Sequence, residues 1–186
     1  MERLRRGRSA FTLIEVLIGV AVLTIAITAL LGAFLGQVLV AQHARNLTWA
    51  MNDASRVMEQ MRQQNTTPCI GGTLPSSNPP TGFASWDAWM ASTAATGGGG
   101  KSIQPDPAVD ELIVVTCRNE ANTANCTGVD DPIRVTVAVC WRHRGRILGE
   151  CVWNGALQSS DGSNSFTANS VIESQAMLST LMTCRT

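Results

Sequence analysis

Glu15 is the residue whose type and position most invite chemistry, because it is the only charged side chain among residues 11–35. The same stretch holds fifteen Leu, Ile, Val and Phe residues. About 20 helical residues span the core of a bilayer, so this stretch is long enough to cross one with some tilt. An ionisable group within a membrane helix is a functional hypothesis that needs a partner. If the chain is cut before Phe11, the new terminal ammonium lies four residues from Glu15 and supplies that counter-charge.

Transfer free energies favour insertion of this stretch into a membrane. Its apolar side chains together favour the bilayer by about 4–9 kcal/mol, whereas one ionised Glu costs about 3 kcal/mol at most. No cation follows the stretch before Arg45, and the cations that precede it are Arg3, Arg5, Arg6 and Arg8. The positive-inside rule therefore predicts a cytoplasmic N-terminus. A cleavable secretory signal is the alternative, but its apolar region usually has about 7–15 residues and is followed by an Ala-x-Ala-like site.

The sequence around the carboxylate reads RSA at 8–10 and FTLIEVLI at 11–18. It resembles the processing and N-methylation motif of the type IV pilin family, which includes major and minor pilins and the pseudopilins of type II secretion. The resemblance implies that a prepilin peptidase cleaves between Ala10 and Phe11 and that the Phe11 amine is then methylated. It also implies that Glu15 pairs with the Phe11 amine of a neighbouring subunit during assembly. The family usually has Gly before the cleaved bond, where this chain has Ala10.

What the resemblance implies for function is a structural filament subunit. Its partners would be the prepilin peptidase and methyltransferase, other pilins or pseudopilins, and an inner-membrane assembly platform. The chain would cross the bacterial inner membrane once, with its C-terminal domain in the periplasm, before it enters a pilus or pseudopilus. Length and the six cysteines favour a minor pilin of the pilus-modification type. A minor pseudopilin of type II secretion is the first alternative, and a single-span periplasmic enzyme or binding protein is an alternative of another class.

The elements that position these residues begin with one long helix. An apolar stripe recurs at steps of three and four residues, through Val40, Ala44, Leu47, Met51, Ala54, Met58 and Met61. This period predicts a helix from about residue 11 to residue 64, stopped by the residues before Pro68. The charged residues off the stripe are expected to face solvent; they are Arg45, Asp53, Arg56, Glu59 and Arg62.

The rest of the chain is expected to form a short helix and an antiparallel sheet. Residues 85–91 predict the helix. Residues 112–117, 133–141 and 147–153 predict strands, with a hairpin turn at 143–146 and polar turns over 154–170. Residues 176–184 fit either an edge strand or a helix, and the neighbouring sheet favours a strand. A sheet laid across the apolar stripe buries both faces. The expected fold is α+β, with a leader at 1–10, a membrane or filament-core helix at 11–35, an amphipathic helix at 36–65, and a disulfide-containing loop and sheet region at 66–186.

All six cysteines follow the apolar stretch: Cys69, Cys117, Cys126, Cys140, Cys151 and Cys184. An even number in an extracytoplasmic domain favours disulfides over zinc, since no Cys-x-x-Cys pair is present and His43 and His143 lack ligand spacing. A hairpin that turns at 145–146 would place Cys140 opposite Cys151. The remaining cysteines could then pair as Cys117 with Cys126 and Cys69 with Cys184.

Other motifs carry weaker hypotheses. The sequence ATGGGGKS at 95–102 matches a relaxed phosphate-binding loop, but no buried strand precedes it and no helix follows, so a flexible loop is the better interpretation. Asp130-Asp131 and residues 161–164 could bind calcium but are more typical of polar turns. The cations Arg142, Arg144 and Arg146 could contact DNA phosphates, although a solvated turn is the simpler interpretation.

Composition excludes two further classes of protein. Charged residues make up 15% of the chain and the formal net charge is zero. A charge-rich disordered chain and a strong overall field for a polyanion are therefore both excluded. No nucleophile–base set stands out in the sequence, so we expect no enzymatic activity and no cofactor.

The first test concerns the mature N-terminus. In a cell that contains prepilin peptidase, mass spectrometry is expected to find a chain that begins at methylated Phe11. A protein that still begins at Met1 in such a cell would contradict processing and would favour the anchored periplasmic protein.

Overall fold

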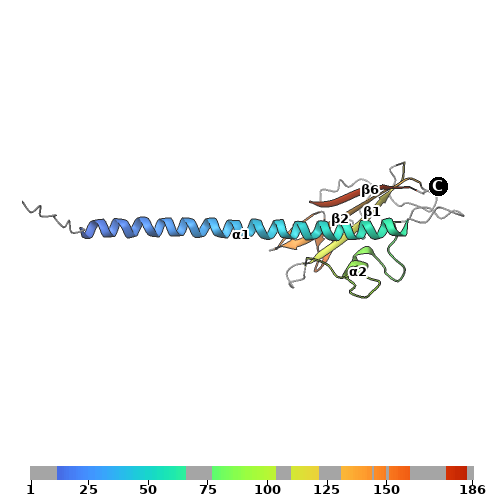
Figure 1. Ribbon diagram of the computed structural model, residues 1–186, viewed down its shortest axis with the longest axis horizontal. Coiled ribbons are helices and arrows are strands. Elements are labelled where there is room, and N and C mark those ends of the chain that lie inside the picture. The colour runs from blue at the N-terminus through green and yellow to red at the C-terminus, as the bar shows by residue number, and fades with distance from the viewer. Residues whose placement is uncertain are drawn as a thin grey trace, which may run out of the picture. The chain divides into compact units, whose positions relative to one another are not determined.

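The computed structural model describes residues 12–65, 77–103, 110–121, 131–143, 145–149, 151–159 and 175–183. The chain divides into two units, residues 1–44 and 45–186. One helix, α1 (Leu13–Gln64), contributes to both units, as the sequence predicted (Figure 1). At its C-terminal end the side-chain amide of Asn65 donates a hydrogen bond to the Met61 carbonyl at 2.8 Å. Pro68 lies outside the described residues.

The second unit contains a four-stranded antiparallel sheet, with β2 (Ile133–His143) at its centre. β1 (Glu111–Arg118) pairs along one side of β2. β3 (Arg146–Leu148) and β6 (Ala176–Met182) follow one another along the other side. A separate two-stranded sheet consists of β4 (Cys151–Trp153) and β5 (Leu157–Ser159). The predicted α+β fold, with a helix on an antiparallel sheet, is confirmed.

One face of the large sheet packs on the C-terminal part of α1. Alternation along β2 turns five side chains to this face: Ile133, Val135, Val137, Val139 and Trp141. They form one core cluster with buried residues of α1: Ala50, Ala54, Val57, Met58 and Met61. Each of these ten side chains is at most 5% exposed. Burying an apolar side chain of this size contributes roughly 1.5–3 kcal/mol, so this contact is the main source of cohesion in the domain.

The predicted apolar stripe is wrong at its beginning and too narrow later on. Val40 is 70% exposed and Ala44 is exposed, because no described segment covers α1 there. Further along, Ala50 and Val57 are buried although they were not part of the stripe. Residues of α2, β1, β2 and β6 all belong to the core cluster that contains this part of the helix, so its buried face is wider than a three-four repeat indicates.

The second face of the sheet is partly covered by the β4–β5 sheet. Leu112 and Val114 of β1 form a smaller cluster there with Ala138 of β2 and Leu157 of β5. A disulfide joins Cys140 of β2 to Cys151 of β4, with a Cα–Cα distance of 6.3 Å. This distance lies within the usual range for a disulfide. The covalent bond therefore ties the small sheet to the central strand of the large one.

The hairpin register differs from the prediction although the disulfide is the expected one. His143 pairs with Arg146, so the turn lies between these two residues and not at 145–146. In this register Gly149, the residue after Leu148, lies opposite Cys140. The predicted strand 147–153 breaks at Gly149, whose φ of +104° suits glycine, and β4 then begins at Cys151 in the other sheet. β5 lies within the segment predicted to contain only polar turns.

The described residues test the other two predicted cysteine pairs only in part. Cys117 is also disulfide-bonded. Its predicted partner Cys126 lies outside the described residues, as do Cys69 and Cys184. No cysteine in the described part of the chain is free.

The short helix α2 (Trp86–Ala91) and the glycine-rich loop after it form one packed unit. Ser85 caps α2 by accepting a hydrogen bond from the Ala88 amide at 3.1 Å. The Gly98 amide donates to the Trp89 carbonyl at 2.8 Å, and the Gly100 amide donates to the Met90 carbonyl at 2.9 Å. These amides are therefore occupied and form no phosphate cradle. The predicted flexible loop is wrong, because these contacts pack the glycines on α2: a Cβ at Gly98 would lie 2.6 Å from the Met90 Cα.

A buried polar cluster joins this loop to α1. Asp53, which is fully buried, accepts hydrogen bonds from the amide and the hydroxyl of Ser102, each at 2.6 Å. Glu111 of β1 is 2% exposed and accepts from the Ile103 amide at 3.1 Å. The prediction that Asp53 faces solvent is therefore wrong, because residues 102–103 cover that side of the helix.

An ion pair connects the same loop to α2 and β1. The Lys101 ammonium lies 2.8 Å from the Asp87 carboxylate, and it also donates to the Glu111 carbonyl. The same carboxylate of Asp87 accepts from the Ile113 amide at 2.9 Å. Residues 101–103 thus connect α1, α2 and β1 through polar groups that are largely buried.

The pKa of Glu111 is raised from its ordinary 4.5 to about 8. Burial is the largest cause, and the nearby Asp53 carboxylate adds to it, while the Ile103 amide and Lys101 oppose the rise. The native state therefore keeps the Glu111 proton over a pH range in which the unfolded chain has lost it. Stability from this group is complete below about pH 4.5 and is lost as pH rises through about 8.

Replacing Glu111 by Gln is expected to flatten the pH dependence of unfolding between about pH 4.5 and 8. Gln stays neutral, so the free energy of unfolding of wild type should fall relative to Glu111→Gln across that range. Urea titrations of the full chain in detergent, followed by tryptophan fluorescence, measure this difference. Glu120→Gln makes the same chemical change at an exposed position and should leave the slope unchanged. Parallel profiles for wild type and Glu111→Gln would contradict the expectation.

Candidate assembly site

The N-terminal part of α1 has no protein cover. Every residue from 12 to 41 is exposed, and the large apolar ones include Leu13 at 79% and Leu35 at 69% exposure. By length and composition α1 can cross a membrane, and it is the one helix among the described residues that can. So large an apolar surface needs lipid or other protein around it, because soluble monomers rarely expose contiguous apolar patches beyond a few hundred Å².

Glu15 lies in the first turn of this apolar helix. Its amide donates to the Thr12 carbonyl at 3.0 Å, which places the residue among the first helical positions. A carboxylate at a helix N-terminus is stabilised by the unpaired amides and the helix dipole there. Ala10 and Phe11, the predicted cleavage and methylation residues, lie outside the described residues. The role of Glu15 as the assembly charge therefore remains a prediction.

Small side chains share the face of α1 that carries Glu15. At 100° per residue, four of them lie within about 40° of Glu15 around the helix axis. They are Gly19, Ala26, Ala29 and Ala33. Small residues let another helix approach closely in an apolar environment. The spacing of these residues from Glu15, in steps of three, four and seven positions, is a signal that the sequence alone contains.

Two threonine hydroxyls on the exposed helix form hydrogen bonds within the helix. The hydroxyl of Thr24 donates to the Ala21 carbonyl at 2.8 Å, and that of Thr28 donates to the Ile25 carbonyl at 2.9 Å. The helix passes through Gly32 and Gly36 without a break. Helical backbone satisfies its own hydrogen bonds, as a membrane segment must. Glu15 is therefore the one charged group that this surface offers between residues 12 and 44.

One arginine of the basic hairpin contacts an aromatic ring. The guanidinium of Arg142 lies 3.9 Å from the centre of the Trp153 ring, a cation–π contact between β2 and β4. Arg146 is exposed, and Arg144 lies outside the described residues. The DNA contact suggested for these three cations stays a prediction. Within the described residues no group of three His, Cys, Asp or Glu side chains could hold a metal ion.

Comparison with known protein families gives a match for the N-terminal segment. Residues 5–31 match the prokaryotic N-terminal methylation motif. The chain carries the type IV pilin and pseudopilin signature. This pilin-type motif implies processing by a prepilin peptidase and assembly with other pilins, and together with the apolar helix it indicates membrane anchoring. Comparison with curated proteins and with solved structures gives no match.

A bulky side chain on the Glu15 face of this pilin-like helix is expected to impair assembly. Ala26→Phe should separate neighbouring helices and lower incorporation into filaments roughly tenfold, the effect of about 1–3 kcal/mol of overpacking. Ala21→Phe makes the same change at a position about 120° from Glu15 around the helix axis and is the matched control. Quantitative immunoblots of purified filaments and of membranes measure incorporation. Equal incorporation of the two variants would show that the small-residue face does not contact other subunits.

Proposed function

We propose that this protein is a minor, non-catalytic subunit of a type IV pilus or pilus-like filament. The supporting observation is the exposed apolar half of α1, which presents one carboxylate and a face of small residues. The methylation motif at 5–31 supports the same class. Length and six cysteines favour the pilus-modification type of minor pilin, and a minor pseudopilin of type II secretion is the second candidate.

The proposed location before assembly is the inner membrane. Four leader arginines would hold the N-terminus in the cytoplasm, and residues 11–35 would cross the bilayer. The C-terminal domain would then lie in the periplasm. The Cys140–Cys151 disulfide and the bonded state of Cys117 agree with an oxidising compartment.

The proposed mechanism is a transfer of the apolar helix from lipid to a filament core. Processing between Ala10 and Phe11 leaves an amine at the start of the helix. The unpaired Glu15 carboxylate makes the lipid-embedded monomer less favourable. In the filament the carboxylate pairs with the Phe11 amine of a neighbouring subunit, while apolar side chains contact other helices. A buried ion pair of this kind is well suited to set the axial register between subunits.

The proposed role of the C-terminal domain is display on the filament surface. Its disulfide-tied sheets and the polar cluster of Asp53 and Glu111 hold α1 on the large sheet. Forces on the filament would then be carried by one continuous helix from the core into the domain. No catalytic step is part of this function.

Removing the carboxylate at position 15 tests the proposed function. Glu15→Leu should insert into the membrane at least as well as wild type, because an ionised side chain is replaced by an apolar one. Loss of one partner of a buried ion pair costs about 3–5 kcal/mol, so incorporation into filaments should fall on the order of a hundredfold or more.

The measurement compares membrane and filament fractions by quantitative immunoblotting. Glu120→Leu makes the same substitution at an exposed position of the C-terminal domain and should assemble as wild type does. Equal incorporation of Glu15→Leu and wild type would overturn the pairing of Glu15 across subunits.

A further inference from the structure

Strand β6 lies at one side of the large sheet, and no other described strand pairs with its outer edge. Among the described residues it pairs with β2 alone, in one continuous register from Ala176 to Met182. Its seven residues, AMLSTLM, include no charge, no proline and no glycine. Proteins usually protect an exposed edge with charges, prolines or bulges, because unpaired amides and carbonyls attract another strand. β6 carries none of these protections.

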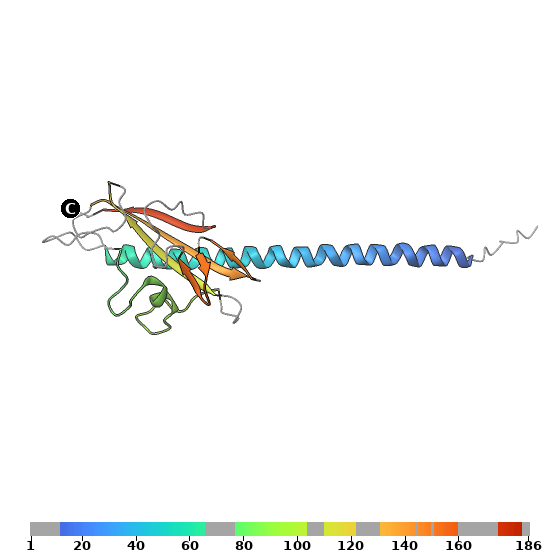
Figure 2. The same cartoon turned by 180° about the vertical axis from the view of Figure 1, so that it is seen from behind.

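At the opposite edge of the sheet, a side chain of α2 takes up a backbone amide of β1. The Asp87 carboxylate of α2 accepts the Ile113 amide of β1 at 2.9 Å, and Lys101 holds that carboxylate in place. In both views of the domain β6 and α2 lie on opposite sides of the C-terminal part of α1 (Figures 1 and 2). The contrast between the two edges points to β6 as the edge available for strand addition.

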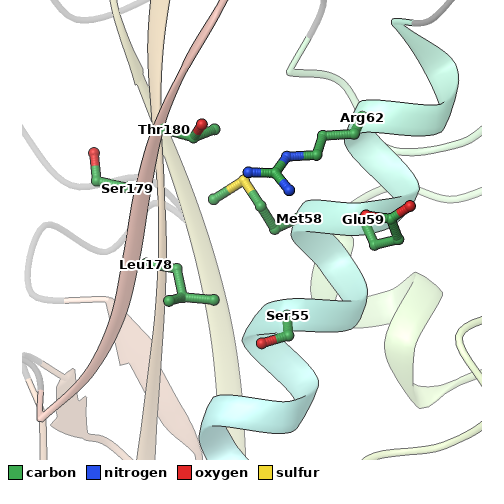
Figure 3. A pocket seen from close by; sticks show the side chains of 7 residues that line it. All are labelled: Ser55, Met58, Glu59, Arg62, Leu178, Ser179 and Thr180. Atoms are coloured by element: carbon green, nitrogen blue, oxygen red, sulfur yellow. The ribbon is translucent and has the colours of Figure 1, made fainter.

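A groove of about 320 Å³ lies beside this edge, between α1 and β6. Figure 3 shows Met58 and Leu178 facing each other across it, which gives it an apolar floor. The Arg62 guanidinium extends from α1 toward β6 above Met58, whereas Glu59 points away from the strand. Arg62 makes no ion pair with any described residue, and it gives the rim of the groove a positive charge beside the acidic Glu59.

We propose that β6 and this groove bind an extended strand of another pilin-type subunit. The strand would hydrogen-bond to the edge of β6, place an apolar side chain between Met58 and Leu178, and present a carboxylate to Arg62. Strand addition obtains affinity from the main chain and specificity from such side-chain pockets. A lipid tail could fill the apolar floor, but it offers no backbone groups to the edge of β6.

This inference rests on the proposed function, because other filament subunits are the partners that function supplies. The charge at Arg62 restricts the partner to a strand with an acidic side chain at one position. Opposite charges across an interface chiefly set the choice of partner and its register.

Site-specific photo-crosslinking in assembled filaments tests the contact. A photoreactive residue at position 180, which lines the groove, should crosslink to a strand segment of a second processed subunit, identified by mass spectrometry of the adduct. Position 181 is the control, because neighbouring residues of a strand face opposite sides and Leu181 is 60% exposed away from the groove. Position 181 should not yield that adduct.

Charge reversal tests the specificity of the groove. Arg62→Glu should lower the adduct at position 180 about tenfold. Arg146→Glu makes the same change at an exposed arginine on β3 and should leave the adduct unchanged. Arg62→Gln should give a smaller loss, and retention of the Cys140–Cys151 disulfide in every variant would verify that the domain has folded.

Three results would overturn the inference: adducts only within the same chain, no adduct from filaments that contain the protein, or an adduct that Arg62→Glu leaves unchanged. Each of these leaves the proposed function intact if wild type is processed and incorporated. Failure of wild type to enter filaments would instead overturn the proposed function, and the inference with it.

Discussion

The structure depends on one constraint: about half of a single long helix is apolar and has no cover from the described chain. Residues 12–41 of α1 are all exposed, and Glu15 is the one charged group among them. A surface of this kind is compatible with lipid or with a bundle of similar helices, but not with water. The arginines that precede it in the sequence, the carboxylate within it and the disulfide-tied domain after it are all consistent with the proposed transfer from lipid to a filament core.

The second half of α1 meets the opposite requirement, because it must hold a domain. Apolar contact with β2 contributes most of the cohesion, through side chains such as Val57 and Trp141. Polar groups then determine what lies beside the helix: Asp53 holds residue 102, and Asp87 with Lys101 holds the edge of β1. Breaking one partner of such a buried pair is costly, so this cluster supports one arrangement of the loop over others.

Much of the fold and the site follows from local pattern. The helix, the alternating strand β2 and the capped helix α2 were predicted because each has a period or a cap that does not depend on distant residues. Position 53 was mispredicted, because a charged residue at the border of an apolar stripe reads as solvent-facing unless the covering loop is known. The hairpin turn was misplaced by one residue, which shifts the residue opposite Cys140 by two, since Gly145 permits a turn at either position and only strand pairing decides between them.

The amino-acid sequence by itself determined the membrane-length helix, its lone carboxylate, the methylation motif and the fold class, because these depend on composition and short-range spacing. Tertiary structure alone decided that Asp53 and Glu111 share a buried site, that Cys151 belongs to a second sheet, and that β6 lies beside a groove. Those features arise from contacts between residues far apart in the chain, and their energies depend on which groups lose water together when the domain packs.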